Sequence, residues 1–221
     1  MPQISLNRCQ PNLLPWKDAR LSPRCTPVTD DPLAPGLLLA SPNLDDPNFE
    51  QTVILLGHHD ADGALGWVIN GTALMQVEEL LRSSGLISAA AATTLGPGFF
   101  QPARVGGPVD PATGWIVYRH KDFRPENFIE LGAGLGVTGD SDALDRVMKG
   151  KGPQDFRMLI GYSGWGPGQL ESELQQGAWL PAAVDPVLVF DTPSEKVWEE
   201  AYRRSVGLSP VAFRSGRRGQ A

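Results

Sequence analysis

The chain is poor in cysteine: only two of its 221 residues are cysteines, Cys9 and Cys25. Both lie in the first 34 residues, ahead of the hydrophobic segments that predict a core. Small secreted domains commonly depend on disulfides, and structural zinc sites commonly depend on cysteine thiolates. The low cysteine content therefore excludes both from the predicted core and favours a reducing, cytoplasmic location.

Long apolar runs are also missing. No segment reaches the ~18 uninterrupted apolar residues that indicate a transmembrane helix. The first 35 residues contain Leu13 and Leu14 but are interrupted by Pro11 and Pro15, so they lack the apolar stretch of a signal peptide. We therefore expect a cytoplasmic protein with no membrane partner.

An excess of positive charge is the third absence. The formal net charge is −6 at pH 7, and residues 35–206 carry 22 acidic against 12 basic side chains. Binding to a nucleic-acid duplex depends on Lys and Arg that neutralise phosphates. An acidic core therefore argues against direct nucleic-acid binding. Arg214, Arg217 and Arg218 lie in the last residues, which we interpret as a solvated end.

The remaining composition divides the chain into three parts. Residues 1–34 are rich in proline and show no hydrophobic periodicity, so they predict a disordered N-terminal extension. Residues 35–208 contain the periodic hydrophobic segments, and their length suits one domain. Residues 209–221 predict a basic, disordered tail.

Short hydrophobic runs between turn signals predict that strands dominate this domain. The predicted strands cover residues 37–40, 52–56, 64–69, 115–118, 128–131, 135–137, 156–162 and 187–190. Residues 58–63 predict a hairpin turn, and residues 89–102 predict a loop. Because strands outnumber helices and do not alternate regularly with them, the fold class is α+β rather than a doubly wound sheet.

Helices are predicted at four places. Apolar residues at helical spacing within residues 74–81 predict an amphipathic helix. Asp140 is a suitable N-cap for a second helix, and the turn at residues 166–168 opens a third. Residues 192–195 read T-P-S-E, a capping box with proline at the first helical position, and predict a final helix.

Residues 36–42, 59–70, 106–109 and 161–171 match, in order and spacing, the pattern of the YqgE/AlgH family. The last stretch, G-Y-S-G-W-G-P-G-Q-L-E, is long and highly specific. The resemblance extends over roughly Pro35 to Leu208. It implies a compact domain around a small closed sheet, so we predict a single α+β domain with a mostly antiparallel, partly closed, barrel-like sheet surrounded by helices. The family often carries the label of transcriptional regulator, which these residues do not themselves show.

The chain departs from the family pattern at several positions. Gly57 stands where the family usually has a cysteine, and Gly71–Thr72 stands where it usually has Arg-Pro. Thr113 replaces an arginine, and Tyr118 replaces a histidine whose role His120 does not inherit. These changes remove a thiol, two cations and an imidazole, and with them any mechanism that depends on those groups.

The segment from Gly161 to Glu171 is the best candidate site. A strand, a glycine-rich turn and a helix N-terminus would present unpaired backbone N–H groups, which suit an anion. The segment is neither a P-loop nor a dinucleotide motif, and Ser163 is not in a nucleophile elbow because Gly164 follows it directly. The alternative is that the glycines permit tight backbone packing or a bulge. The candidate ligand-binding residues, with the predicted second wall and rim, are Gly106, Gly107, Pro108, Gly161, Ser163, Gly164, Trp165, Gly168, Gln169, Glu171 and His59.

Histidines and carboxylates suggest two further chemistries. His58, His59 and Asp60 resemble a metal cluster, but adjacent strand residues point to opposite faces, and a transition metal needs three or four converging ligands. No metal site and no cofactor are predicted. Glu171 and Glu173 diverge on a helix, so they do not form an acid–base pair by themselves.

Two functions remain open from the sequence. The first is a non-catalytic regulatory protein that binds a protein partner or a small anionic ligand at the glycine-rich cleft. The second is a small hydrolase that acts on a phosphorylated or nucleotide substrate and uses Glu171 and His59. The first is favoured, because no set of residues identifies a catalytic machine.

Overall fold

The computed structural model describes residues 33–120 and 123–210. Residues 1–32 and 211–221 lie outside it, and with them Cys9, Cys25, most of the predicted extension and the arginines of the predicted tail. Within the described ranges, no helix is both long and apolar enough to cross a membrane.

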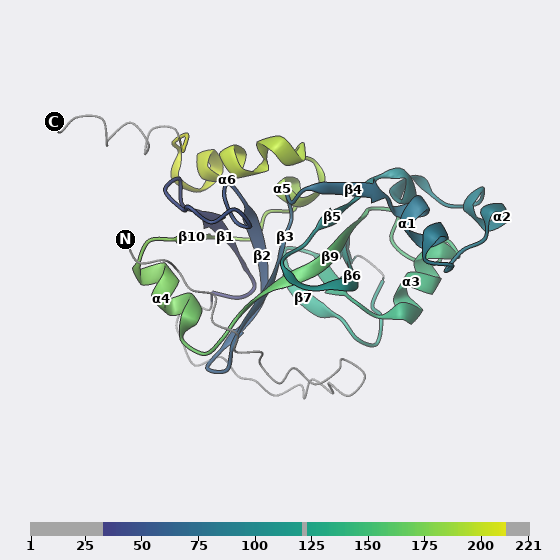
Figure 1. The fold of residues 1–221 in the computed structure, drawn as a ribbon, viewed down its shortest axis with the longest axis horizontal. Helices are drawn as coiled ribbons and strands as arrows, with labels where there is room; N and C mark the ends of the chain where they lie inside the picture. The colour runs from purple at the N-terminus through teal and green to yellow at the C-terminus, as the bar shows by residue number, and fades with distance from the viewer. Residues whose placement is uncertain (1–32, 121–122, 211–221) are drawn as a thin grey trace.

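The described residues form one α+β domain around a ten-stranded sheet (Figure 1). The strands are β1 (Gly36–Ala40), β2 (Val53–Asp60), β3 (Gly63–Val68), β4 (Ala73–Gln76), β5 (Pro102–Val105), β6 (Val109–Arg119), β7 (Ile129–Gly132), β8 (Leu135–Thr138), β9 (Phe156–Trp165) and β10 (Trp179–Ala182). Their main order is β10-β1-β2-β3-β9-β6-β8-β7, while β5 pairs with β9 and β4 pairs with β5. Only the β5–β9 pairing is parallel. The predicted fold class is confirmed.

Strand β9 lies at the centre of the sheet. Its first part pairs with β6 and β5, and its last residues, Ser163 to Trp165, pair with β3. The sheet curls from there until β7 approaches β2: a Cβ added at Gly57 would lie 3.1 Å from Cδ2 of Leu131. No backbone pairing joins these two strands, so the sheet is partly curled and open rather than a closed barrel.

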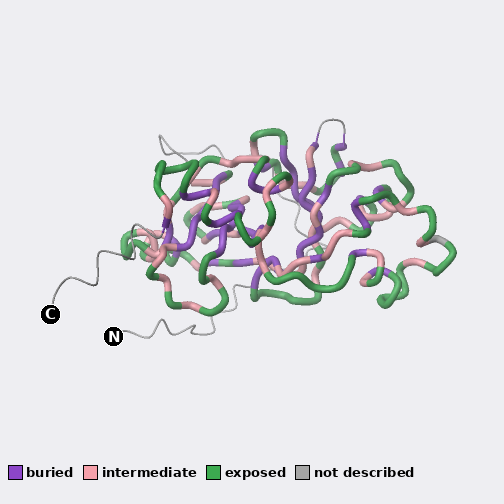
Figure 2. Tube along the Cα trace, turned by 90° about the horizontal axis from the view of Figure 1, so that it is seen from above, coloured by how far each residue is buried: buried purple, intermediate pink, exposed green. Residues whose placement is uncertain are grey.

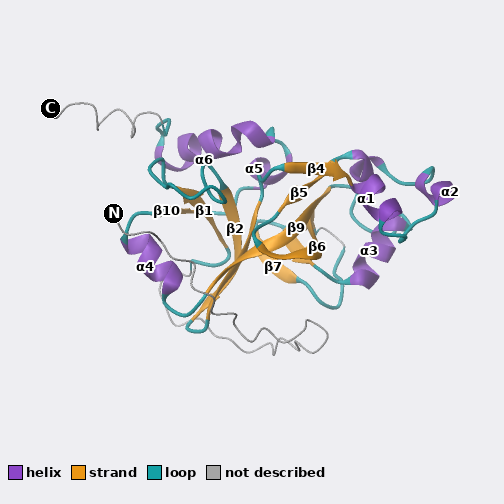
Figure 3. Ribbon diagram, in the orientation of Figure 1, coloured by secondary structure: helices purple, strands orange, loops and turns teal. Residues whose placement is uncertain are grey.

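Helices cover the curled sheet at three places (Figure 3). They are α1 (Val77–Ser83), α2 (Ala89–Ala92), α3 (Ser141–Met148), α4 (Gln169–Gln175), α5 (Pro186–Phe190) and α6 (Val197–Val206), with 3-10 turns η2 (Pro97–Phe100) and η3 (Ser194–Lys196). One buried cluster joins the sheet to α5 and α6, a second lies under α1 and α3, and a third lies under α4. Figure 2 shows the buried segments running through the interior of the domain.

The first predicted helix begins later than the spacing suggested. Residues 73–76 form strand β4, which pairs with β5 at the edge of the sheet, and α1 begins only at Val77. Leu74 was predicted to lie on the helix, but it is on this strand and 42% exposed. Backbone pairing with β5 has overridden the helical spacing of the apolar residues.

The predicted last strand at residues 187–190 is wrong. Asp185 accepts a hydrogen bond from the backbone N–H of Val187, and Pro186 occupies the first turn, so this segment forms helix α5. The last strand of the described residues is instead β10, an edge strand that contains Pro181 and pairs only with β1. An edge strand tolerates proline because one row of its N–H groups needs no partner.

Two local predictions need smaller corrections. Strand β2 continues through His58 to Asp60 with a register shift between Leu56 and His58, so the hairpin turn is shorter than predicted. Thr192 does not cap the last helix, because its hydroxyl donates to the carbonyl oxygen of Val187 at 2.9 Å. The predicted N-cap at Asp140 is confirmed, since its side chain accepts from the backbone N–H of Asp142.

Candidate functional site

The Gly-Gly segment before β6 lies directly against the backbone of β9. The N–H of Gly106 donates to the carbonyl oxygen of Ile160 at 2.7 Å, and the carbonyl oxygen of Gly106 accepts from the N–H of Val68 at 2.8 Å. A Cβ added at Gly107 would lie 2.2 Å from the carbonyl oxygen of Tyr162. These glycines therefore allow two backbone segments to touch, and Gly107 faces protein rather than a cleft.

Most of the glycine-rich signature is strand rather than turn. Residues 161–165 belong to β9, and only residues 166–168 form the turn that precedes α4. Gly161 has a positive φ of 74°, and a Cβ there would lie 2.6 Å from the carbonyl oxygen of Gly107. A Cβ at Gly106 would in turn lie 2.6 Å from the carbonyl oxygen of Gly161, so the two segments pack tightly from both sides, as the packing alternative predicted.

Ser163 is buried, and its hydroxyl has no hydrogen-bond partner within the described part of the chain. It pairs with Gly66 on β3, whereas His59 lies on β2, the strand on the other side of β3. Two strand spacings amount to roughly 9–10 Å. Ser163 and His59 therefore cannot form a nucleophile–base pair with each other.

The polar side chains of α4 make structural contacts. One carboxylate oxygen of Glu173 accepts from Nε1 of Trp165 at 2.9 Å and from Nε1 of Trp179 at 2.7 Å. Gln169 accepts from the N–H of Gly166 and donates to the other oxygen of Glu173. These bonds fix α4 and two buried indoles against the sheet.

His59 and Glu171, which the sequence placed in the same hypothesis, do come together. Nε2 of His59 lies 2.8 Å from Oε1 of Glu171, and the two side chains are 19% and 43% exposed. Hydrogen bonds from the backbone N–H of Glu171 itself and from His59 hold the pKa of the Glu171 carboxyl below its usual value. The pair joins the end of β2 to the first turn of α4.

The neighbouring histidine has a different partner. Nε2 of His58 lies 2.9 Å from Oδ2 of Asp60, on the same strand. Among the residues that the structure describes, no group of three histidine, cysteine or acidic side chains is placed to hold a metal ion. Gly164 and Gly168 are exposed, and Pro108 is exposed beside Gly107.

A polar cleft of about 580 Å³ lies elsewhere, between the β4–β5 edge of the sheet and the η3–α6 segment. Its lining residues come from segments far apart in the chain and carry no recognised motif. They are Gln51, Asn70, Gly71, Thr72, Ala73, Arg104, Ser194, Glu195, Trp198, Glu199 and Pro210. None of the predicted ligand-binding residues lines this cleft, and sequence reasoning missed it.

Arg104 on β5 is the cation of this cleft. Its Nη1 donates to the carbonyl oxygen of Gly71 at 3.0 Å, and burial lowers the pKa of its guanidinium, while the charge of Glu195 acts in the opposite direction. No carboxylate of the described residues lies within 4 Å of it in an ion pair. A guanidinium has five N–H donors, so most of its donor capacity is available to a ligand.

Asn70 holds the part of the cleft lining that precedes β2. Its Oδ1 accepts from the N–H of Val53 at 2.8 Å, and its Nδ2 donates to the carbonyl oxygen of Gln51 at 2.9 Å. Gln51 itself has a positive φ of 55°, uncommon for a residue with a side chain. Strained backbone of this kind often occurs at binding sites, and here Asn70 stabilises it.

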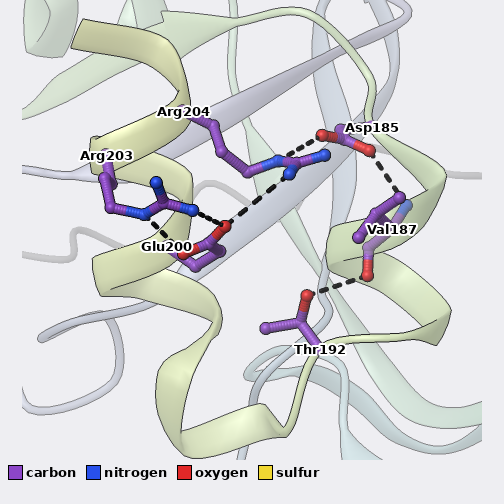
Figure 4. Close-up of polar contacts among 6 residues, drawn as sticks. All are labelled: Asp185, Val187, Thr192, Glu200, Arg203 and Arg204. Atoms are coloured by element: carbon purple, nitrogen blue, oxygen red, sulfur yellow. Dashed lines mark hydrogen bonds and ion pairs between the residues drawn. The ribbon is translucent and has the colours of Figure 1, made fainter. Parts of the chain in front are cut away.

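The helical wall is fixed by contacts between α5 and α6 (Figure 4). Nε of Arg204 donates to Oδ2 of Asp185 at 2.7 Å, while Glu200 lies between Arg203 and Arg204. Trp198, which also lines the cleft, donates from Nε1 to the carbonyl oxygen of Ala40 at 2.8 Å. The wall is therefore tied both to α5 and to β1.

Comparison with known proteins places this architecture in a family. A family model described as AlgH-like (DUF179) matches residues 37–209. The chain belongs to the AlgH-like family. The predicted family is thereby confirmed.

Relatives of the AlgH-like family share most of the chain. A UPF0301 protein of Anaeromyxobacter dehalogenans is 41% identical over 186 residues, which cover 83% of this chain and 93% of that protein. A UPF0301 protein of Ruegeria pomeroyi is 36% identical and covers 76% and 88% of the two chains. Among solved structures, the AlgH protein from Pseudomonas aeruginosa is 30% identical with a TM-score of 0.68, covering 89% of this chain and all of that one. A protein of Corynebacterium diphtheriae, 21% identical with a TM-score of 0.65 over 82% of this chain and 92% of its own, shares the fold.

The positions at which the sequence departs from the AlgH-like pattern lie in different surroundings. Gly57 packs beside the ring of Trp67, and Tyr118 is buried, which raises the pKa of its hydroxyl. Thr113 donates to Oδ2 of Asp110 at 2.5 Å. Gly71–Thr72, in contrast, lines the polar cleft next to Arg104. The departure at this last position therefore changes the chemistry of the cleft lining.

A second, smaller cleft of about 400 Å³ lies between α1, α3 and the sheet. Seven of its fifteen lining residues are leucine, isoleucine or methionine, including Leu81, Ile116 and Met158. Asp140 and Ser141 at its rim belong to the N-terminus of α3. It continues the buried cluster beneath these two helices, and it contains no cation.

Proposed function

We propose that this AlgH-like protein is a non-catalytic, cytoplasmic binding protein with a regulatory role, and that its ligand occupies the polar cleft between β5 and α6. The observation that carries the proposal is Arg104, a partly buried guanidinium that lines the cleft and has no carboxylate partner there. A small ligand with an anionic group would complete its hydrogen bonds, because guanidinium and carboxylate or phosphate match in geometry.

The size and lining of the cleft support a small ligand. Ligand sites typically measure about 300–1,000 Å³ and place a few polar groups around a concave surface. This cleft measures about 580 Å³ and combines Arg104 with the hydroxyls of Thr72 and Ser194 and with the ring of Trp198. A long nucleic acid is disfavoured, because Glu195 and Glu199 lie on the opposite wall.

The lining also favours binding over catalysis. Hydrolytic catalysis commonly needs a nucleophile beside a base that a third group orients. The lining residues include two hydroxyls but no histidine, lysine or cysteine that could activate them. A regulatory role is the simplest use of a site that binds a ligand without reacting with it. Binding could change how the protein interacts with a protein partner, or it could act on this chain alone.

The test is a thermal-shift screen of the full chain with carboxylates, phosphates, nucleotides and amino acids. A specific ligand at ~100 times its dissociation constant stabilises by ~2.7 kcal/mol, which for a chain of this size raises Tm by roughly 5–10 °C. Arg104→Gln should remove the response. Arg119→Gln, which changes a half-buried arginine paired with Asp191 outside the cleft, should keep it. A flat screen, or equal responses of both variants, contradicts the proposal.

A second candidate is a hydrolase that acts on a phosphorylated or nucleotide substrate beside the turn at residues 166–168. The hydrogen bond between His59 and Glu171 favours it, since a carboxylate can orient an imidazole that acts as a base. Its test is release of phosphate from nucleotides and sugar phosphates by the full chain and by His59→Gln. Activity that survives in this variant, or absence of activity in the wild type, counts against it.

A further inference from the structure

The charges of the polar cleft are divided between its two walls. Arg104 lies on the β5 wall, and it is the single cation among the lining residues. Glu195 and Glu199 lie on the wall formed by η3 and α6, and both are exposed. The cleft therefore offers a guanidinium on one side and two carboxylates on the other.

The two carboxylates of the acidic wall are both placed to accept from a ligand. Glu195 and Glu199 are four residues apart along a continuous helical segment, a spacing that places both on the same face. Glu199 accepts one hydrogen bond, from the hydroxyl of Ser209 at 3.1 Å, which leaves acceptor capacity on its carboxylate. Neither glutamate forms an ion pair with a basic side chain of residues 33–120 or 123–210.

Glu195 is close to Arg104 without contacting it. Burial lowers the guanidinium pKa and the charge of Glu195 partly offsets this, yet the two groups are more than 4 Å apart and form no ion pair. The space between the two walls is thus bounded by opposite charges that do not neutralise each other by contact. A simple anion would satisfy Arg104 but would face the repulsion of two carboxylates.

We propose that the ligand of this cleft is a small zwitterion, an amino acid or a short peptide, whose carboxylate binds Arg104 and whose ammonium group binds Glu195 and Glu199. This inference rests on the proposed function and names the chemical class of its ligand. A free amino acid and a peptide share these two charged ends and differ in the distance between them. A dianionic phosphate has no cationic group that could bind Glu195 and Glu199.

The experiment measures binding to the full chain by isothermal titration calorimetry after a thermal-shift ranking. The probes are the common amino acids, a set of dipeptides, and the N-acetylated and C-terminally amidated form of each hit. Acetylation removes the ammonium group and amidation removes the carboxylate. Both changes should weaken binding to the wild type, and the relative affinity of amino acids and dipeptides identifies which source fits.

Variants connect each end of the ligand to its wall. Arg104→Gln should weaken the zwitterion by about 10- to 100-fold, as expected for a charge-assisted pair. The double variant Glu195→Gln/Glu199→Gln should weaken the zwitterion by about 2- to 5-fold for each carboxylate, while the N-acetylated form binds as before or better. Glu79→Gln, which removes a single carboxylate on α1 outside the cleft, should have no effect on binding.

The possible failures are distinguishable. Suppose that a zwitterion and its N-acetylated form bind the wild type equally, and that Arg104→Gln weakens the binding of both. The zwitterion proposal is then refuted, while an anion-binding site at Arg104 remains. If the double variant strengthens both forms, the glutamates compete with the ligand for Arg104, which also overturns the inference. If no probe or other anion binds, the proposed function fails with it.

Discussion

Gly161 offers a direct test of the view that the glycine-rich signature serves backbone packing. Its φ of 74° disfavours any side chain, and a Cβ would lie 2.6 Å from the carbonyl oxygen of Gly107 and 2.9 Å from that of Val109. Gly168, in the same signature, has an almost identical φ of 71° but no atom within 4 Å of an added Cβ. The pair of positions therefore separates conformational strain from steric overlap.

The expected costs follow from this difference. A non-glycine residue in the left-handed region costs roughly 1–2 kcal/mol, and both Gly161→Ala and Gly168→Ala should lose about that much. Overlap with backbone atoms adds roughly 1–3 kcal/mol, as overpacking does in cores, and only Gly161→Ala should show this addition. We expect a total loss of about 2–5 kcal/mol for Gly161→Ala.

Urea unfolding of the full chain measures both losses, with tryptophan fluorescence and circular dichroism as independent probes of two-state behaviour. Equal losses for the two variants would refute the packing argument. If Gly161→Ala is instead stable but loses the thermal-shift response to a ligand, Gly161 belongs to a ligand-binding site.

Three other expectations follow from single contacts. Glu173→Leu should destabilise by about 2–4 kcal/mol in urea unfolding, because two indole N–H donors lose their shared charged acceptor, whereas Glu173→Gln should lose less. The pKa of the Glu171 carboxyl is lowered in the folded protein. Its contribution to stability is therefore complete above the ordinary glutamate pKa near 4.5 and is lost as the pH falls through the pKa of the folded state. In Glu171→Gln, Tm should consequently fall less steeply below pH 5 than in the wild type. Arg104→Met should change the free energy of unfolding by no more than about 1 kcal/mol, because a partly buried guanidinium without an ion-pair partner among the described residues contributes little to stability. A large loss would indicate a structural role.

The parts of the fold that the sequence predicted well are those where local and tertiary preferences agree. Strand β1 reads as a short buried run and is buried throughout. Asp140 both starts a periodic helix and caps it. Of the parts that were wrong, residues 73–76 pair with β5, a partner distant in sequence. Residues 187–190 instead follow local signals, a proline at N1 and an aspartate N-cap, which outweigh their β-branched composition.

The candidate site divides in the same way. His59 and Glu171 are 112 residues apart, and the hydrolase hypothesis named both of them, although the sequence did not predict the hydrogen bond between them. The polar cleft carried no such signal, because Gln51, Arg104 and Glu195 belong to three separate segments and are ordinary surface residue types. These three residues come together only because the sheet curls and helix α6 packs against β1.

The residues that identify the family are therefore not the residues that line the polar cleft. Glycines 106, 107 and 161 are recognisable because backbone contact between β9 and the segment before β6 excludes every other residue type. A cleft that selects a ligand by charge depends on a few side chains, and these can change without disturbing that contact. Gly71–Thr72 lies beside Arg104 and is the position where this chain differs from the expected Arg-Pro. An arginine at position 71 would bring a second cation to a cleft that now has one, but its Cβ would lie 2.0 Å from the carbonyl oxygen of Val105. The charge balance of the cleft can therefore change at this position only together with a shift of the local backbone.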